Sequence, residues 1–115
     1  MRSRSALAII SFVTIGVAYA GHLAVAAQGD PPGKAPYEEN CRKCHGVRGI
    51  PPKTMKAKYP KIATFDSAFF VKHSQDSIVT IMTKGKSQDM KSFKDKLSHE
   101  EMENVAKYIK TFATK

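Results

Sequence analysis

Five consecutive residues carry the most specific chemistry in this 115-residue chain. They read Cys41-Arg42-Lys43-Cys44-His45, and the sequence contains no other cysteine. Two thiols three positions apart on a helical turn point to the same side, so each can form a thioether with one vinyl group of a haem. The imidazole of the next residue can then ligate the iron. The spacing therefore predicts a covalently attached haem c at Cys41, Cys44 and His45.

Other uses of the C-x-x-C pattern fit the sequence less well. A tetrahedral zinc site would need further ligands from elsewhere in the chain, because these are its only cysteines. A thioredoxin-like redox site would need a βαβ context, and no alternating strand pattern is visible. A disulfide between the two cysteines would close a very short loop and add little stability. The haem interpretation accounts for both the cysteine count and the adjacent histidine.

A six-coordinate haem iron needs a second axial ligand from the protein. Met82 and Met102 repeat with apolar neighbours at helical spacing, which predicts core packing. Met55 follows His45 too closely to pass around the ring. Met90 lies in a loop between two predicted helices, and a loop can place its sulfur on the opposite haem face. Because His/Met is a known axial pair, we expect Met90 to be the ligand, the alternative being an ordinary surface methionine. The other candidates are His73 and His99, both expected to be exposed.

The segment after the motif, Gly46–Pro52, predicts a loop that can orient the histidine. Its prolines lack N–H donors but leave carbonyls free to accept hydrogen bonds. We expect a carbonyl near Ile50 or Pro51 to accept from the second ring nitrogen of His45, which would fix the orientation and tautomer of the ring. Pro51 is therefore a candidate cofactor-binding residue.

Two helices are expected to enclose the motif from the two ends of the chain. The first begins near Pro36 and runs into the motif, with Tyr37, Cys41 and Cys44 on one inward face. The last begins at a capping box formed by Ser98 and Glu101, and its apolar stripe should pack across the first helix.

Two further helices are expected between them. Asp66 is a suitable N-cap for a short helix that contains Phe69, and a second helix should run from Ser74 to Gly85. No strand pattern occurs anywhere, so the predicted fold class is all-α, with about four short helices.

The N-terminus has the features of an export signal. Arg2 and Arg4 precede an apolar run and several small-residue cleavage patterns, which predicts a signal peptide over residues 1–27. The alternative is a retained membrane anchor, since about 20 largely apolar residues can span a bilayer. In either case the expected location is periplasmic, and a retained anchor would hold the protein at the membrane. Residues 28–35 would then form a flexible leader, and residues 36–115 a single haem domain.

The size and net charge of the chain limit the classes of function that it can have. A domain this small often needs a cofactor to complete its core. The formal net charge of +9 favours acidic partner surfaces, whereas nucleic acid is not expected, because the chain has no recognisable nucleic-acid fold. No general acid–base pair or nucleophile stands out, so we do not expect an enzyme.

The chain resembles the small class I c-type cytochromes over nearly all of the region after the signal. The matching segments are Tyr37–Gly46, Pro51-Pro52, Asp89–Phe93, Leu97–Glu101 and Val105–Ile109.

This resemblance implies a cytochrome c-like fold around one haem c, with His45 and Met90 as axial ligands and electron transfer as the activity. One departure is Lys91, because the family usually has proline directly after the ligand methionine. That difference should leave the loop less stiff.

The expected function is therefore that of a soluble, monomeric one-electron carrier between respiratory or photosynthetic partners, such as a cytochrome complex, oxidase, reductase or reaction centre. Lysines near the haem would steer it to acidic docking surfaces. Two alternatives are a haem subunit of a larger membrane complex and a ligand sensor in which Met90 is labile. The steering lysines are expected to be Lys43, Lys53, Lys56, Lys86, Lys91 and Lys94.

Overall fold

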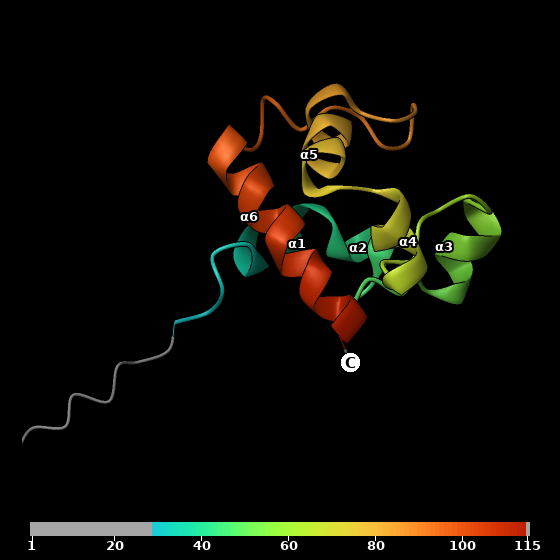
Figure 1. The fold of residues 1–115 in the computed structure, drawn as a ribbon. Coiled ribbons are helices and arrows are strands. Elements are labelled where there is room, and N and C mark those ends of the chain that lie inside the picture. The colour runs from blue at the N-terminus through green and yellow to red at the C-terminus, as the bar shows by residue number, and fades with distance from the viewer. Residues whose placement is uncertain (1–28, 115) are drawn as a thin grey trace, which may run out of the picture.

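The computed structural model describes residues 29–114, and all regular elements in that range are helices (Figure 1). The predicted all-α fold class is confirmed. The predicted signal peptide, residues 1–27, lies outside the described residues. Among the described residues, no helix is both long and apolar enough to cross a bilayer. The elements are α1 (Lys34–Asn40), α2 (Arg42–His45), α3 (Lys53–Lys58), α4 (Ser67–Lys72), α5 (Gln75–Lys84), α6 (His99–Lys110) and the 3-10 helix η1 (Thr111–Thr114).

The first helix begins two residues before the predicted start at Pro36, because Gly33 packs directly on α6. A Cβ at Gly33 would collide with the backbone carbonyl of Asn104, so only glycine permits this approach. The helix breaks at Cys41, whose φ is −120°, and continues as α2. Sequence periodicity did not reveal this break, since both halves keep the same inward face.

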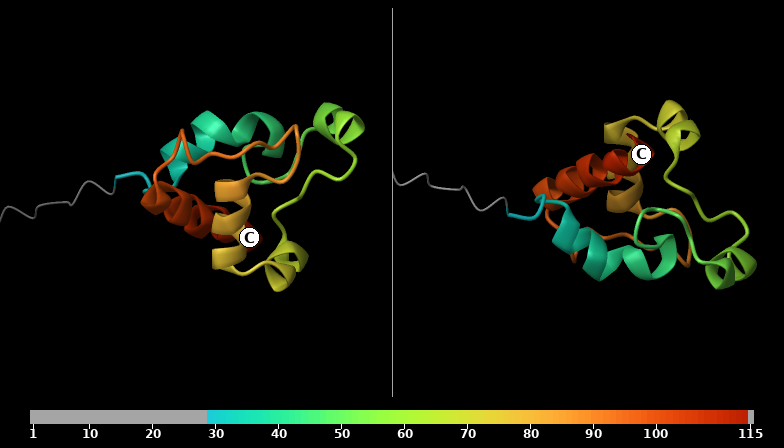
Figure 2. Two further views of the ribbon diagram at one scale, coloured as in Figure 1. Left: turned by 90° about the horizontal axis from the view of Figure 1, so that it is seen from above. Right: turned by 90° about the horizontal axis from the view of Figure 1, so that it is seen from below.

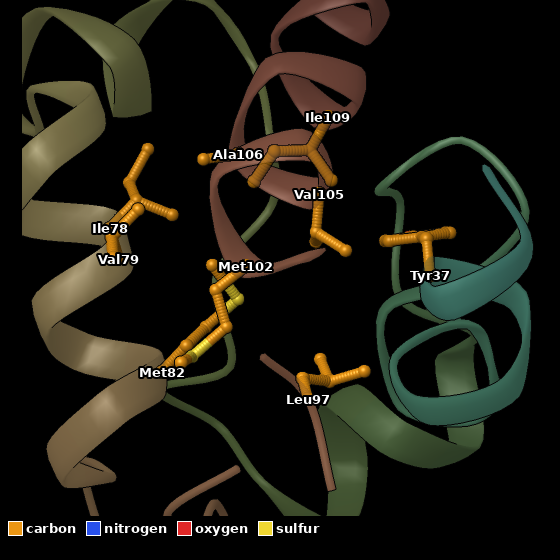
Figure 3. Packing of buried hydrophobic residues seen from close by; sticks show 9 residues of the cluster. All are labelled: Tyr37, Ile78, Val79, Met82, Leu97, Met102, Val105, Ala106 and Ile109. Carbon is orange, nitrogen blue, oxygen red and sulfur yellow. The ribbon is translucent and has the colours of Figure 1, made fainter. Parts of the chain in front are cut away.

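The core lies where α6 packs between α1 and α5, as Figure 3 shows. Tyr37 reaches α6 from α1 and is only 1% exposed. The expected packing of the last helix on the first is thus present, and Figure 1 shows α6 crossing in front of α1. The buried residues are Tyr37, Ile78, Val79, Met82, Leu97, Met102, Val105, Ala106 and Ile109.

The predicted helix starts are confirmed by hydrogen bonds. Asp66 accepts from the N–H of Phe69 at 2.8 Å, and Ser74 Oγ accepts from Ser77 at 3.2 Å. The capping box at α6 is complete, since Ser98 and Glu101 each accept from the backbone N–H of the other. Each cap satisfies donors that an open helix end leaves unpaired.

One helix was not predicted. α3 contains three lysines in six residues and buries none of its side chains, so it has no apolar stripe that periodicity could detect. It begins after Pro52, whose carbonyl accepts hydrogen bonds from Met55 and Lys56. Figure 1 shows α3 at the edge of the molecule, away from α6.

Candidate haem site

A cavity of about 620 Å³ contains four of the five predicted site residues. Cys41, Cys44, His45 and Met90 all line it, whereas Pro51 does not. Figure 2 shows α1 and α2 on one side of the molecule and α5 and α6 on the other, and residues of α1, α2, α5 and α6 line the cavity.

The rest of the wall is mainly apolar, and its size falls within the roughly 300–1,000 Å³ of small-molecule and cofactor sites. In the described part of the chain, no charged side chain is buried. Two thiols, an imidazole and a thioether in one apolar cavity suit a haem c, so these residues fit the predicted group. The apolar residues that line the cavity include Phe65, Phe69, Ile78, Ile81, Met82, Phe93, Val105 and Ile109.

The Cys41 thiol does not have the properties of a reactive C-x-x-C cysteine. Cys41 and Cys44 are both free and partly buried. Burial, with a smaller contribution from Cys44, raises the pKa of the Cys41 thiol to about 11. Reactive C-x-x-C motifs instead have a lowered pKa, because the thiolate is the nucleophile. No cluster of three or more potential metal ligands of the His, Cys, Asp and Glu types occurs in the described residues.

The carbonyl that faces His45 belongs to Ala63. Its oxygen lies 3.3 Å from Nδ1 of His45. A carbonyl can only accept, so Nδ1 carries the proton and Nε2 keeps its lone pair for a metal. Burial lowers the pKa of His45, and the Ala63 hydrogen bond opposes that effect only in part. The lowered pKa favours the neutral ring, which is the form that ligates iron.

The prediction that His45 bonds a carbonyl near Ile50 or Pro51 was wrong, because Nδ1 of His45 faces the Ala63 carbonyl. Instead, the Ile50 carbonyl lies against Gly46, where any Cβ would collide with its oxygen. Pro51 is buried but lies outside the cavity. The tight turn after the motif thus places the Ile50 carbonyl at Gly46, and the carbonyl that faces His45 comes from further along the chain.

Tyr37 anchors that turn. Its hydroxyl donates a 2.7 Å hydrogen bond to the carbonyl of Gly46, and its ring contacts Tyr108 and Phe112 edge-on at 5.6 and 5.3 Å. One side chain therefore ties the end of α2 to α6 and η1. The inward position of Tyr37 was predicted from helical spacing, but its hydroxyl partner could not be.

The loop that carries Met90 is held by its own hydrogen bonds. The Met90 carbonyl accepts from Lys86 at 2.8 Å, and the Met90 N–H donates to Ser87 Oγ at 3.1 Å. Further along, Ser92 Oγ donates to the Thr83 carbonyl at 2.6 Å. These contacts fasten the loop to the end of α5. They supply stiffness that the missing proline after Met90 would otherwise give.

Only one of the other ligand candidates shares the cavity. Met82 lines the cavity, but it also belongs to the buried core, with only 4% of its surface exposed, as expected of a packing residue. Met102 is buried in the core, and Met55 is half-buried outside the cavity. His73 is half-buried, with its ring centroid 4.5 Å from that of Phe69, although the sequence predicted that His73 would be exposed. His99 is exposed as expected, with Nε2 3.5 Å from a carboxylate oxygen of Glu103.

Sequence reasoning missed Ala63 and Phe65. A backbone carbonyl gives no residue-type signal, so Ala63 could be found only from coordinates. Phe65 stacks on His45 with the ring centroids 4.7 Å apart and the planes 16° from parallel. Its apolar character indicates burial but does not indicate which ring it contacts.

Comparisons with known proteins agree with this site. The chain matches the family model described as "Cytochrome C oxidase, cbb3-type, subunit III" over residues 29–109. The chain belongs to this family. Together with its structural neighbours, the match establishes a small monohaem c-type cytochrome, and the family implies haem c and electron transfer.

Two solved structures resemble this cytochrome. One is the KustC0563 c-type cytochrome, with 28% identity and a TM-score of 0.63, covering 70% of this chain and 96% of its own. The other is a point mutant of that protein, with 27% identity and a TM-score of 0.62, covering 70% and 98%. No curated protein matches the chain.

The turn after the motif generates a first prediction. Gly46→Ala should destabilise the cytochrome by about 1–3 kcal/mol, because Gly46 has a φ of +81° and its missing Cβ makes room for the Ile50 carbonyl. Denaturant unfolding measures the loss. Gly29→Ala is the matched control, since nothing lies within 4 Å of its Cβ position. Equal stability of the two variants would contradict this account of the turn.

Proposed function

We propose that this cytochrome is a one-electron carrier with one haem c bound covalently through Cys41 and Cys44, and with His45 and Met90 as axial ligands. When bound, the haem supplies a ferric–ferrous couple that accepts or donates a single electron. The observation that carries the proposal is the meeting of these four side chains in one apolar cavity.

The protein's own residues explain how such a site would be tuned. The Ala63 carbonyl fixes the tautomer of His45, which would leave the lone pair of Nε2 free to ligate the haem iron. Apolar walls keep water away and disfavour additional positive charge, which favours the reduced form. A methionine thioether acts in the same direction, because His/Met ligation raises the potential. Because His45 and Met90 would both ligate the iron and leave no position for a substrate, the residues support electron transfer rather than substrate binding.

We also propose that the cytochrome is exported to the periplasm and that residues 1–27 act as its signal. The small-residue pattern before residue 28 supports cleavage.

A mass measurement on the purified protein tests cofactor and N-terminus together. The expected mass is that of the chain cleaved near residue 27, plus one haem. Cys41→Ser and Cys44→Ser should each leave the haem held by a single thioether. A compact native protein without any haem increment would contradict the proposal.

The axial assignment gives a separate prediction. Met90→Ala should abolish the absorption band in the red that arises from sulfur–iron ligation, because the second ligand is lost. Met82→Leu should retain the band, since a leucine of similar volume replaces a packing residue. Visible spectra of the oxidised variants measure both. If Met82→Leu lost the band and Met90→Ala kept it, the second ligand would be Met82 on α5.

The docking surface follows from the distribution of charge. Residues 41–65 contain seven basic side chains and no acidic one. All seven are exposed, and in the described residues the ion pairs are Lys34–Asp30 and His99–Glu103, which involve none of them. Lys58 and Lys61 line the cavity, as does Lys86 from the opposite loop. We propose that this surface docks to acidic redox partners, because such fields raise association rates.

A pair of charge reversals tests the surface. Lys53→Glu with Lys56→Glu should slow oxidation of the reduced cytochrome by ferricyanide, an anion, by roughly tenfold at low salt. Lys107→Glu with Lys110→Glu on α6 changes the net charge equally and should slow it less. Stopped-flow absorbance at low and high salt measures both. Equal slowing in the two pairs would show that only net charge matters.

The family description favours a second candidate, a haem subunit working within an oxidase complex. The two candidate functions use the same redox site and differ in whether the protein is attached to the membrane. Retention of residues 1–27 in the purified protein, together with recovery from membranes, would favour the subunit over the free carrier.

A further inference from the structure

We propose that Phe65 is a positioning residue that sets the plane of the His45 imidazole. This inference rests on the proposed function, since it concerns how His45 would be presented to the haem iron. The two rings lie face to face, with centroids 4.7 Å apart and planes 16° from parallel. A ring stacked at this distance restricts rotation of the His45 imidazole about its Cβ–Cγ bond.

Two restraints on the same ring come from one short segment. The Ala63 carbonyl faces Nδ1 of His45, and the Phe65 side chain covers the face of the ring. The hydrogen bond fixes the direction of Nδ1, and the stacked ring fixes the tilt. Neither restraint alone would define the orientation of Nε2, whereas together they do.

Phe65 is itself held firmly. Its N–H donates a 2.9 Å hydrogen bond to the Gly49 carbonyl, and its ring packs on Phe69 at 5.1 Å. Gly49 has a φ of +70°, and a Cβ there would lie 2.7 Å from Phe65 and 2.9 Å from Phe112. The glycine therefore lets the loop after the motif close directly on Phe65. Because these contacts hold the Phe65 ring in place, it can in turn restrain the His45 ring.

Phe65 also separates two hollows. It lines the candidate haem cavity, and it lines a second surface hollow of about 490 Å³ together with Arg48 and Ile50. Removal of the ring would bring this second hollow into contact with His45. Water near the histidine would stabilise the ferric state, so the midpoint potential should fall.

The test compares ring-free and ring-retaining variants of the haem-loaded protein. Phe65→Leu and Phe65→Ile remove the ring, Phe65→Tyr retains it, and Phe70→Leu removes a nearby ring that contacts Phe69 rather than His45. The readouts are the spread of the haem methyl proton shifts in ferric protein, which reports the imidazole plane, and the midpoint potential. Mass spectrometry establishes haem loading first.

We expect Leu and Ile at position 65 to change the methyl-shift spread and lower the potential, and Phe65→Tyr to retain the wild-type values. Phe70→Leu should change neither. Haem-loaded Phe65→Leu or Phe65→Ile with wild-type shifts would overturn the positioning role and leave the carrier function intact. Wild-type protein without haem would overturn both proposals.

Discussion

The site depends on one constraint, which is that three of its four candidate haem-binding side chains belong to a single five-residue turn. Cys41, Cys44 and His45 cannot be moved independently, so local backbone geometry sets the spacing of these three side chains along one wall of the cavity. Every other element must be arranged to face that wall. The α5 and α6 helices supply the apolar surface opposite, and the loop around Met90 supplies the remaining thioether.

The structure fixes this wall by contacts at both of its ends. Before the motif, Tyr37 is buried against α6, and Gly33 lies directly on the α6 backbone. After it, Gly46 and Gly49 adopt positive φ and let the chain fold back on itself. Bulky residues at these glycines would separate the loop from its neighbours. The precision of the site therefore comes from small residues around the motif as much as from the motif.

The sequence was sufficient where side-chain type and spacing carried the signal. The cysteine spacing, the helix caps at Asp66, Ser74 and Ser98, and the inward face of α1 all express local rules. It was insufficient where a backbone atom or a through-space contact decided the outcome. The carbonyl of Ala63 replaced the expected one near Pro51, and α3 formed without an apolar stripe. Such features depend on where the chain returns in space, which spacing along the sequence does not encode.

The position of α6 has a consequence for the order in which the molecule is assembled. Val105 and Ile109 close the cavity, yet they lie near the end of the described chain, long after the cysteines. A chain synthesised from its N-terminus thus exposes both thiols before the closing wall exists. An incomplete chain is open to any enzyme that must reach the sulfurs, and the last helix then covers part of the cavity that the two cysteines line.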